Sequence, residues 1–373
     1  MMTLLYIIAF VSALAMSLLM TPVVKRFAFM VGAVDQPNQR KVHTRVMPRL
    51  GGLAIFAAFA GALFVVLPVL QEFNANAVAA LLVGGSIIVL TGALDDRFEL
   101  SPKLKLLGQL LAACVVAAFG LTIDVTLINL PFVGEEWLKD LSWLSVPLTI
   151  LWIVGVTNAI NLIDGLDGLA GGVSAIATAT MMVLALMMGN VTVVLLCAVL
   201  LGSVIGFLFY NFYPAKIFMG DSGALFLGFS LATMSVLGFK QATLVSFVVP
   251  LFVLGVPLSD TFFAIVRRIV NKTPISMADK NHLHHCLLRL GLSHRGAVLV
   301  IYGISIVFSA FAILMSQTNM LWVTIGLIVL ALFLMEIAAE AIGIINKNKK
   351  PLLRFLHRLG NRTVRLLGIH SQR

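Results

Sequence analysis

Charged residues are scarce in this sequence. Of its 373 residues, 11% are Asp, Glu, Lys or Arg, and 60% are hydrophobic. An average soluble domain has about 25% charged residues and about 45–50% apolar ones. A soluble core of this size has no need for so much apolar surface. The composition therefore favours a chain with many membrane spans, each of which needs about 20 apolar residues.

Cysteine and early positive charge are also lacking. Three cysteines, Cys114, Cys197 and Cys286, are too few for a disulfide framework. No Lys or Arg precedes Lys25, whereas a cleaved secretory signal carries positive residues at its front. We therefore expect a retained first span rather than a signal peptide.

Apolar runs predict an all-α polytopic membrane protein with about eleven transmembrane helices. The expected spans lie near residues 3–24, 50–70, 77–94, 104–121, 143–159, 168–188, 191–210, 223–239, 243–265, 297–315 and 320–345. Placing the loops around 25–49, 95–105, 211–221 and 266–296 and the chain from 346 in the cytoplasm collects 24 of the 26 Lys and Arg residues there. The positive-inside rule then predicts an outside N-terminus and a cytoplasmic C-terminus.

The expected organisation is one transmembrane catalytic domain, residues 1–345, with cytoplasmic loops near 25–49, 95–105, 158–168, 211–222 and 266–296. Residues 346–373 form a basic tail whose apolar and arginine residues alternate. This spacing suits an amphipathic helix on the membrane surface, with a disordered tail that only fixes topology as the alternative. The net charge of +10 is explained by topology and attraction to anionic lipid, so no nucleic-acid partner is expected.

Two acidic clusters follow expected spans. The pair Asp95-Asp96 precedes Lys103 and Lys105, and adjacent carboxylates can share Mg²⁺ or divide into a base and a ligand. Alone, the pair would also suit an ordinary solvated loop. The second cluster has a polar residue at every third position, which brings side chains together on a helical turn, and its glycines allow a bend. Its members are Asn158, Asn161, Asp164 and Asp167.

A third cluster contains Asn211 and the sequence Gly220-Asp221-Ser222-Gly223 before an expected span. Here Asp221 is a candidate metal ligand, and the backbone N–H groups of the helix start are candidates for holding phosphate oxygens. The alternative is a simple capping aspartate.

Basic and histidine-rich loops complete the candidate site. His282, His284 and His285 lie near Arg268 and suit a diphosphate-binding patch, with a zinc site that includes Asp279 as the alternative. His43 and Arg45 lie in another basic loop that either cradles a lipid phosphate or only fixes topology.

At these residues the sequence resembles the polyprenyl-phosphate N-acetylhexosamine-1-phosphate transferase family. The matching elements are Asp95-Asp96, the Asn-Ala-Ile-Asn-Leu-Ile-Asp-Gly-Leu-Asp-Gly block from Asn158, the Pro-Ala-Lys-Ile-Phe-Met-Gly-Asp-Ser-Gly block from Pro214, and His-Leu-His-His from His282. The branch that makes the first lipid intermediate of peptidoglycan typically has three consecutive histidines followed by Glu. Because Leu283 interrupts the histidines here, the pattern is closer to undecaprenyl-phosphate N-acetylglucosamine-1-phosphate transferases of teichoic-acid, O-antigen or common-antigen synthesis.

The resemblance implies roles by position. Asp221 with Asp164 is expected to bind Mg²⁺, with Mn²⁺ as a substitute, and Asp95, Asp96, Asp164 and Asp167 are the expected catalytic carboxylates. Substrate contacts are expected from the other candidate residues of the clusters and loops described above. These are Asn158, Asn161, Asn211, Lys103, Lys105, His43, Arg45, Arg268, His282, His284 and His285. The implied enzyme sits in the bacterial cytoplasmic membrane with its active site toward the cytoplasm. The implied donor is UDP-N-acetylglucosamine and the implied acceptor is undecaprenyl phosphate.

Several alternatives stay open at this point. The donor could instead be another UDP-sugar such as UDP-MurNAc-pentapeptide, and the reaction could run in one step or through an aspartyl-phosphate. A homodimer is compatible with the sequence. From another class, a secondary transporter would use intramembrane carboxylates such as Asp260 near the bilayer midplane. Half of the 16 acids here instead lie in the proposed cytoplasmic loops, most of them at span ends.

Overall fold

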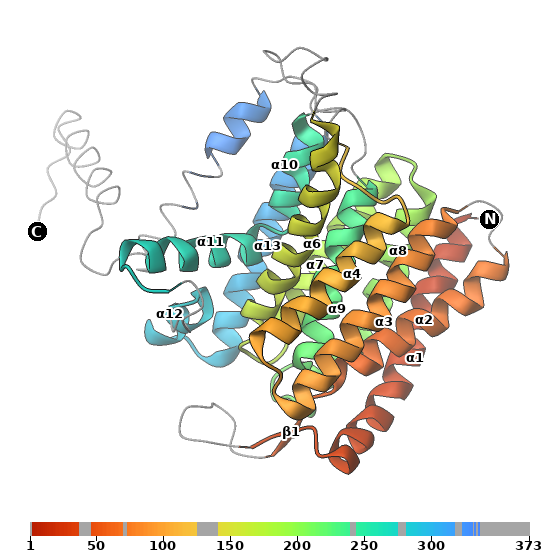
Figure 1. Ribbon diagram of the computed structural model, residues 1–373, viewed down its shortest axis with the longest axis vertical. Coiled ribbons are helices and arrows are strands. Elements are labelled where there is room, and N and C mark those ends of the chain that lie inside the picture. Colours follow the sequence, from red (N-terminus) through yellow and green to blue (C-terminus); the bar gives the residue numbers. More distant parts are fainter. Residues whose placement is uncertain are drawn as a thin grey trace, which may run out of the picture.

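The computed structural model is a bundle of helices that run roughly side by side, with one helix, α11, lying across them (Figure 1). It describes residues 2–36, 46–69, 73–124, 141–238, 244–274, 281–317, 323–330, 332 and 335. The elements are α1 (Met2–Val31), β1 (Val34–Asp35), β2 (Met47–Pro48), α2 (Gly51–Val66), η1 (Leu67–Val69), α3 (Ala75–Phe98), α4 (Pro102–Ala118), η3 (Ser142–Leu144), α6 (Ser145–Ile163), α7 (Leu169–Met187), α8 (Val191–Asn211), α9 (Gly220–Gly238), α10 (Leu244–Val253), α11 (Gly255–Val270), α12 (Leu283–Arg289) and α13 (His294–Ser316).

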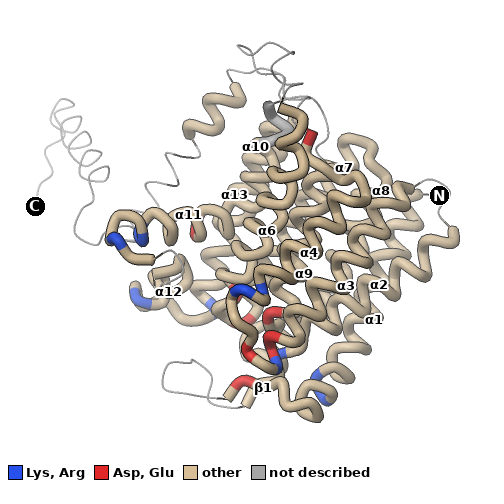
Figure 2. The backbone as a smooth tube through the Cα atoms, viewed as in Figure 1, with Lys and Arg blue, Asp and Glu red and all other residues tan. Residues whose placement is uncertain are grey.

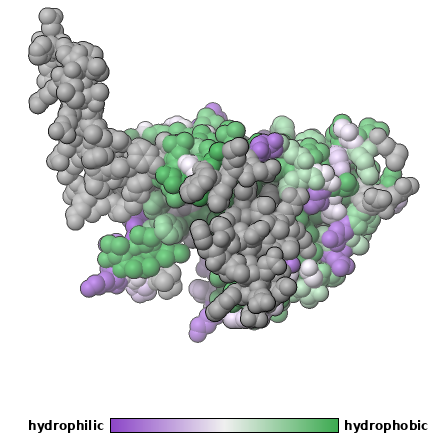
Figure 3. Space-filling model, turned by 90° about the horizontal axis from the view of Figure 1, so that it is seen from above, coloured by the Kyte–Doolittle hydropathy of each residue, from purple (hydrophilic) through white to green (hydrophobic). Residues whose placement is uncertain are grey.

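Among the described residues, eight helical segments are long and apolar enough to cross a membrane. They are Met2–Val31, Gly51–Val69, Ala75–Phe98, Ser142–Ile163, Leu169–Met187, Val191–Asn211, Gly220–Gly238 and His294–Ser316. The surface agrees with this, since wide areas are hydrophobic (Figure 3) and large apolar side chains such as Phe64, Leu90 and Phe209 are exposed. The prediction of a helical polytopic membrane protein is therefore confirmed, while the count of eleven spans stays a prediction.

Three of the eleven expected spans are not among these eight segments. Helix α4 has 17 residues, so it is shorter than the about 20 residues that cross a bilayer. The segment from 320 to 345 lies mostly outside the described residues. The single span expected at 243–265 is wrong, because α10 ends at Val253 and α11 starts at Gly255 in a different direction (Figure 1). Pro250 and Pro257 lack backbone N–H donors, which weakens helical hydrogen bonding around this break.

Helix α9 is the centre of the bundle. Every residue from Ser222 to Gly238 is buried, and the helix packs against α2, α3, α6 and α7. A helix that other helices surround in this way has no lipid-facing or water-facing side. The first turn of α9, which carries Asp221, is thereby held by the whole bundle.

The only strands in the described part of the chain form a short antiparallel pair, in which Val34 lies opposite Pro48 and Asp35 opposite Met47. The chain continues from this pair into α2 and also hydrogen-bonds to the segment before α9: Phe218 N–H donates to Pro48 O over 2.8 Å, and Gly52 N–H donates to Met219 O over 2.9 Å. These contacts fix the end of the bundle at which the acidic motifs gather.

The Lys and Arg residues of the described chain gather at that same end, together with most of the acidic residues (Figure 2). The N-terminal start of α1 lies at the other end (Figure 1). Such an asymmetry is what the positive-inside rule produces. It agrees with the predicted orientation, although which end faces the cytoplasm stays a prediction.

Cysteine labelling tests that orientation. Ser142 and Asn271 are both exposed. Ser142 precedes α6, whose other end leads to Asp164, and Asn271 lies in the loop around 266–296 that is predicted to be cytoplasmic. In intact cells we expect an impermeant thiol reagent to label Ser142→Cys and to spare Asn271→Cys until the membrane is opened. The reverse labelling pattern would show that the protein has the opposite orientation in the membrane.

Candidate active site

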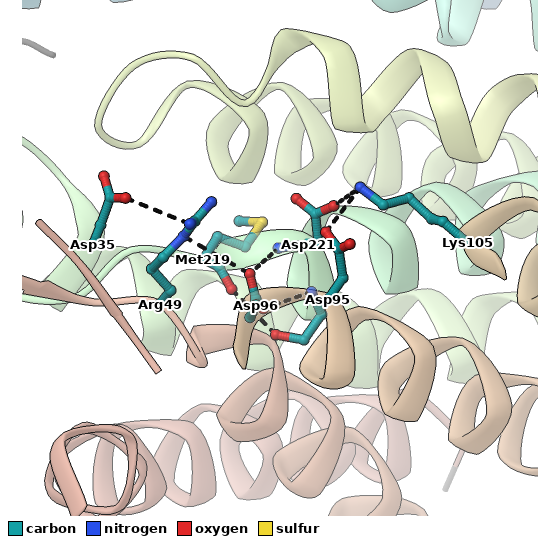
Figure 4. A network of polar contacts seen from close by, with 8 residues as sticks. Asp35, Arg49, Asp95, Asp96, Lys105, Met219 and Asp221 are labelled. Atoms are coloured by element: carbon teal, nitrogen blue, oxygen red, sulfur yellow. Dashed lines mark hydrogen bonds and ion pairs between the residues drawn. The ribbon is translucent and has the colours of Figure 1, made fainter. Parts of the chain in front are cut away.

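An acidic centre joins three helices that are far apart in the sequence. Asp95 lies in the last turn of α3, Lys105 in the first turn of α4 and Asp221 in the first turn of α9. Lys105 Nζ lies 2.9 Å from Asp95 Oδ2 and also contacts Asp221 Oδ2 (Figure 4). One ammonium group therefore bridges two carboxylates. Lys103, the other predicted lysine, is exposed and forms no ion pair with the described residues.

Asp96 caps the central helix. Its side chain has no exposed area, and its two oxygens accept hydrogen bonds from the N–H groups of Asp221 at 2.8 Å and Ser222 at 3.0 Å. A carboxylate at this position satisfies N–H groups that otherwise lack partners at a helix start. The expectation that these N–H groups hold phosphate is therefore wrong, because Asp96 already occupies them.

Arg49 is a member of the site that the sequence did not single out as one. Its Nε lies 4.0 Å from Asp96 Oδ1 and its Nη1 lies 3.4 Å from Asp35 Oδ1 (Figure 4). The guanidinium thus connects the β1–β2 pair to the carboxylate that caps α9. It also gives this acidic region a second fixed positive charge beside Lys105.

Glycines let α2 and α3 approach the start of α9. A Cβ on Gly52 would overlap the backbone of Ser222 and Gly223, and one on Gly92 would overlap the backbone of Ser222. Only residues without side chains permit backbones to come this close. The first turn of α9 is thereby clamped from two sides.

This close approach gives a stability prediction. Replacing Gly52 with Ala should lower the thermal unfolding temperature in detergent, because overpacking a fixed core costs about 1–3 kcal/mol. Gly155→Ala in α6 is the matched control, since a Cβ there would meet nothing within 4 Å. Equal unfolding temperatures for the two variants would contradict the packing of α2 on α9.

The Asn158 to Asp167 block begins on α6 and continues beyond its end. Asn158 exchanges side-chain hydrogen bonds with Gln109 of α4, at 2.6 and 3.3 Å. Helix α6 ends at Ile163, so Asp164 and Asp167 lie in the connection to α7 and not on the same helical turn as the asparagines. The block therefore lines a helix end rather than one helical face.

Asp164 lies close to the acidic centre. Desolvation, together with the negative charges of Asp221 and Asp96, raises the pKa of Asp164 to about 7. Carboxylates crowded in this way repel one another, and a nearby cation relieves the repulsion. The region therefore holds more acidic groups than Lys105 and Arg49 neutralise.

Asp167 and Asn211 join the α6–α7 connection to the α8–α9 connection. Asp167 Oδ2 accepts a hydrogen bond from Ala215 N–H at 3.0 Å, and Asn211 Oδ1 accepts one from Gly168 N–H at 3.1 Å. Helix α13 adds two contacts from the other side: His294 Nε2 accepts from Asp167 N–H at 3.0 Å, and the Tyr302 hydroxyl donates to Gly168 O at 2.6 Å. These residues hold the two connections in register.

The histidine motif surrounds the start of α12. His282 and His284 are buried, and His285 is exposed. The ring of His284 lies against Gly165, where a Cβ would come within 2.7 Å of its Cε1. Burial, with a smaller effect of His285, lowers the pKa of His284 to about 3. His284 is therefore neutral at pH 7 and can offer a hydrogen bond to a substrate but no positive charge.

The remaining predicted residues are not gathered at this centre. Arg268 is half-buried in the last turn of α11, and the Asn161 side chain has no hydrogen bond to the described residues. His43, Arg45 and Asp279 lie outside the described residues, and so does the 346–373 tail.

The side chains that could ligate a metal fit magnesium better than zinc. Within the described residues, no three His, Cys, Asp or Glu side chains converge as a ready-made metal cage. Mg²⁺ does not require one, because it is usually bound by one or two carboxylates and completes its shell with water and substrate phosphates. Asp221 and Asp164, with oxygen donors and excess negative charge, suit this mode of binding.

Comparison with known proteins agrees with the motifs. Residues 78–239 match the family described as glycosyl transferase family 4, a range that contains every acidic residue of the centre. The chain is 48% identical to a probable undecaprenyl-phosphate N-acetylglucosaminyl 1-phosphate transferase of Bacillus subtilis (strain 168), over 95% of this chain and 97% of that protein.

More distant relatives bear similar names. A decaprenyl-phosphate N-acetylglucosaminephosphotransferase of Mycobacterium tuberculosis is 36% identical over 83% of this chain and 82% of its own length. An undecaprenyl-phosphate alpha-N-acetylglucosaminyl 1-phosphate transferase of Salmonella typhi is 26% identical over 83% and 84%. The chain therefore belongs to glycosyl transferase family 4, as the resemblance of its motifs to the polyprenyl-phosphate N-acetylhexosamine-1-phosphate transferases predicted.

Proposed function

We propose that this protein transfers N-acetylglucosamine 1-phosphate from UDP-N-acetylglucosamine to undecaprenyl phosphate. An oxygen of the lipid phosphate attacks the β-phosphorus of the donor, the bond between that phosphorus and the bridging oxygen breaks, and UMP leaves. The product is undecaprenyl diphosphate N-acetylglucosamine. The observation that carries the proposal is the Lys105-bridged pair Asp95 and Asp221, in a chain 48% identical to a relative with that name.

The main chemical problem is charge, because both substrates are anions. Phosphoryl transfer depends on positioning and on positive charge around the phosphates. We assign Mg²⁺ to Asp221 and Asp164, where it would neutralise the donor diphosphate when bound. Lys105 supplies a second positive charge beside the same carboxylate. Asp96 acts indirectly, by capping α9 and so fixing the backbone of Asp221.

The acceptor needs little help from a base. A phosphate monoester has a second pKa near 6, so the lipid phosphate is already largely ionised at pH 7. Asp95 then serves to orient the acceptor and Lys105 rather than to remove a proton. A route through an aspartyl-phosphate is the alternative, and Asp95 is its candidate nucleophile because part of its side chain is exposed, 15%, whereas that of Asp96 is not.

The donor is assigned to the side of the histidine loop. His284 borders Gly165 and so lies next to the connection that carries Asp164. As a neutral imidazole it suits the sugar or nucleoside part of the donor better than its diphosphate. Positive charge for the diphosphate comes in this proposal from Mg²⁺ and Lys105, and the loop that carries His43 and Arg45 stays the candidate for the lipid phosphate.

The cellular setting follows from the same proposal. We place the enzyme in the bacterial cytoplasmic membrane with the acidic centre toward the cytoplasm, the N-terminus outside and the basic tail on the inner surface. Its product would begin a cell-envelope polysaccharide such as teichoic acid or O-antigen. A homodimer remains compatible with this arrangement.

A secondary transporter is the competing class, and Asp260 was its best coupling candidate. In the structure both oxygens of Asp260 are engaged, one by His282 and one by Leu283 N–H, and the carboxyl group is buried. An ion-coupling carboxylate needs access from one side of the membrane. The geometry therefore favours the enzyme.

Detergent-solubilised protein tests the proposed function. With undecaprenyl phosphate and Mg²⁺, we expect UMP release from UDP-N-acetylglucosamine and much less from UDP-MurNAc-pentapeptide, UDP-glucose or UDP-galactose. An enzyme releases UMP without any sealed compartment, whereas a transporter breaks no bond of the UDP-sugar and releases none. Preference for another UDP-sugar would keep the reaction class but change the donor.

A further inference from the structure

Asp260 is a buried carboxylate that the acidic centre does not use. It lies in α11 with 1% of its side chain exposed. Its Oδ1 accepts a hydrogen bond from Leu283 N–H at 2.8 Å, and its Oδ2 lies 2.8 Å from His282 Nδ1. Buried carboxylates are stable only when such partners satisfy them. Here both partners belong to the histidine motif.

These contacts fasten the histidine loop to the bundle. Helix α11 packs against α6 and α13, so Asp260 is held by the membrane-spanning part of the chain. Helix α12 has only seven residues, too few to be stable by itself in water. The Leu283 N–H group belongs to the first residue of α12, so Asp260 caps this short helix from another element.

The anchoring by Asp260 extends to the acidic centre through two parallel histidine rings. The rings of His282 and His284 are nearly parallel, with centroids 6.1 Å apart and planes 4° from each other. The ring of His284 in turn lies against Gly165, next to Asp164. Successive contacts therefore join α11 to the loop between α6 and α7. They run from Asp260 through His282 and His284 to Gly165.

The hydrogen bond also orients His282. A carboxylate at Nδ1 favours a proton on that nitrogen, and the partner of one ring nitrogen sets the state and direction of the other. The parallel stacking then fixes the plane of His284. A fixed ring next to the site can contact a substrate without the entropic cost of ordering it on binding.

We propose that Asp260 is a positioning residue that seats the histidine loop against the acidic centre and thereby sets the affinity for the UDP-sugar donor. This inference rests on the proposed function. It differs from a purely structural role, in which the buried pair would only stabilise the fold and removing it would lower the amount of active enzyme without changing its affinity for either substrate.

Kinetics separate the two roles. In Asp260→Ala we expect the KM for UDP-N-acetylglucosamine to rise about tenfold or more, as for the loss of a residue that orients a binding ligand, with little change in the KM for undecaprenyl phosphate. Asp260→Asn should show a smaller rise, because one amide oxygen can still accept from Leu283 N–H or His282. Ser259→Ala is the control, since among the described residues the Ser259 hydroxyl donates only to Val256 O of its own helix.

A thiol reports on the loop independently of activity. Cys286 lies in α12 and is buried. A small water-soluble maleimide, followed by peptide mapping, should label Cys286 severalfold faster in Asp260→Ala than in wild type or Ser259→Ala. Unchanged labelling would overturn the anchoring role, and faster labelling with an unchanged donor KM would overturn the link to the donor.

The two proposals can fail separately. If wild-type protein transfers no sugar phosphate from any UDP-sugar, the proposed function is wrong, and the donor-affinity part of this inference falls with it. Labelling of Cys286 would still decide whether Asp260 seats the histidine loop.

Discussion

Replacing Asp221 with Asn is expected to lower the turnover number by about three orders of magnitude, because a metal-binding carboxylate at the reacting phosphate is lost. The variant should also need more Mg²⁺ for half-maximal activity. The fold should survive, since the Asn side chain has nearly the same shape and the cap of α9 comes from Asp96 rather than from Asp221. Turnover measured across a Mg²⁺ titration in detergent gives both quantities.

Glu99→Gln is the matched control for this change. Glu99 is an exposed acid that directly follows α3, four residues after Asp95. Removing its charge should leave turnover and the Mg²⁺ requirement close to wild type. Near-normal turnover of Asp221→Asn with an unchanged Mg²⁺ optimum would remove Asp221 from the metal site.

Lys105→Gln is expected to lower kcat/KM by about two to three orders of magnitude, the range for losing one fixed positive group at developing negative charge. The loss should exceed that of a simple charge deletion because Asp95 and Asp221 then face each other without the ammonium between them. Steady-state kinetics with both substrates varied measures this effect.

Lys103 provides the comparison, because it lies two residues earlier on the same helix and is exposed. Lys103→Gln should change kcat/KM less than about threefold, as is usual for a solvent-exposed charge. If the two lysine variants lose activity equally, the ammonium acts through general surface potential, and the bridged carboxylate pair is not the centre of the site.

Much of the fold could be predicted from apolar runs alone. Long runs such as the one around α8 have no other stable location than a membrane or a buried core. The break between α10 and α11 was missed because the whole segment from 243 to 265 is apolar enough for one span. Pro250 and Pro257 were the signal, but proline also occurs inside membrane helices, where neighbours repair the lost bonds.

The acidic residues of the site were also predictable, because carboxylates are costly near a membrane and stand out there. Their arrangement was not. That Lys105 joins Asp95 to Asp221, which lies 116 residues after the lysine, depends on how α3, α4 and α9 pack. Sequence spacing describes neighbours on one helix and gives no distance between helices.

Residues that support the site were the hardest to predict. Gln109 looked like part of an apolar span, yet it pairs with Asn158. Asp96 is adjacent to Asp95 and has the same chemistry, but consecutive residues on a helix point in different directions. One carboxylate therefore caps α9 and the other meets Lys105. The close packing of Gly92 of α3 against the backbone of Ser222 sets how these two helices meet, and sequence spacing does not give that contact.

The fate of the donor β-phosphate tests the central proposal most directly. Purified protein should be incubated with undecaprenyl phosphate, Mg²⁺ and UDP-N-acetylglucosamine that carries radiolabel on its β-phosphorus. Transfer of sugar 1-phosphate predicts that the label appears in the organic-soluble lipid in a one-to-one ratio with UMP, and that none appears without undecaprenyl phosphate. Label that stays in water-soluble UDP while sugar moves to the lipid would show transfer of the sugar alone and would contradict the account.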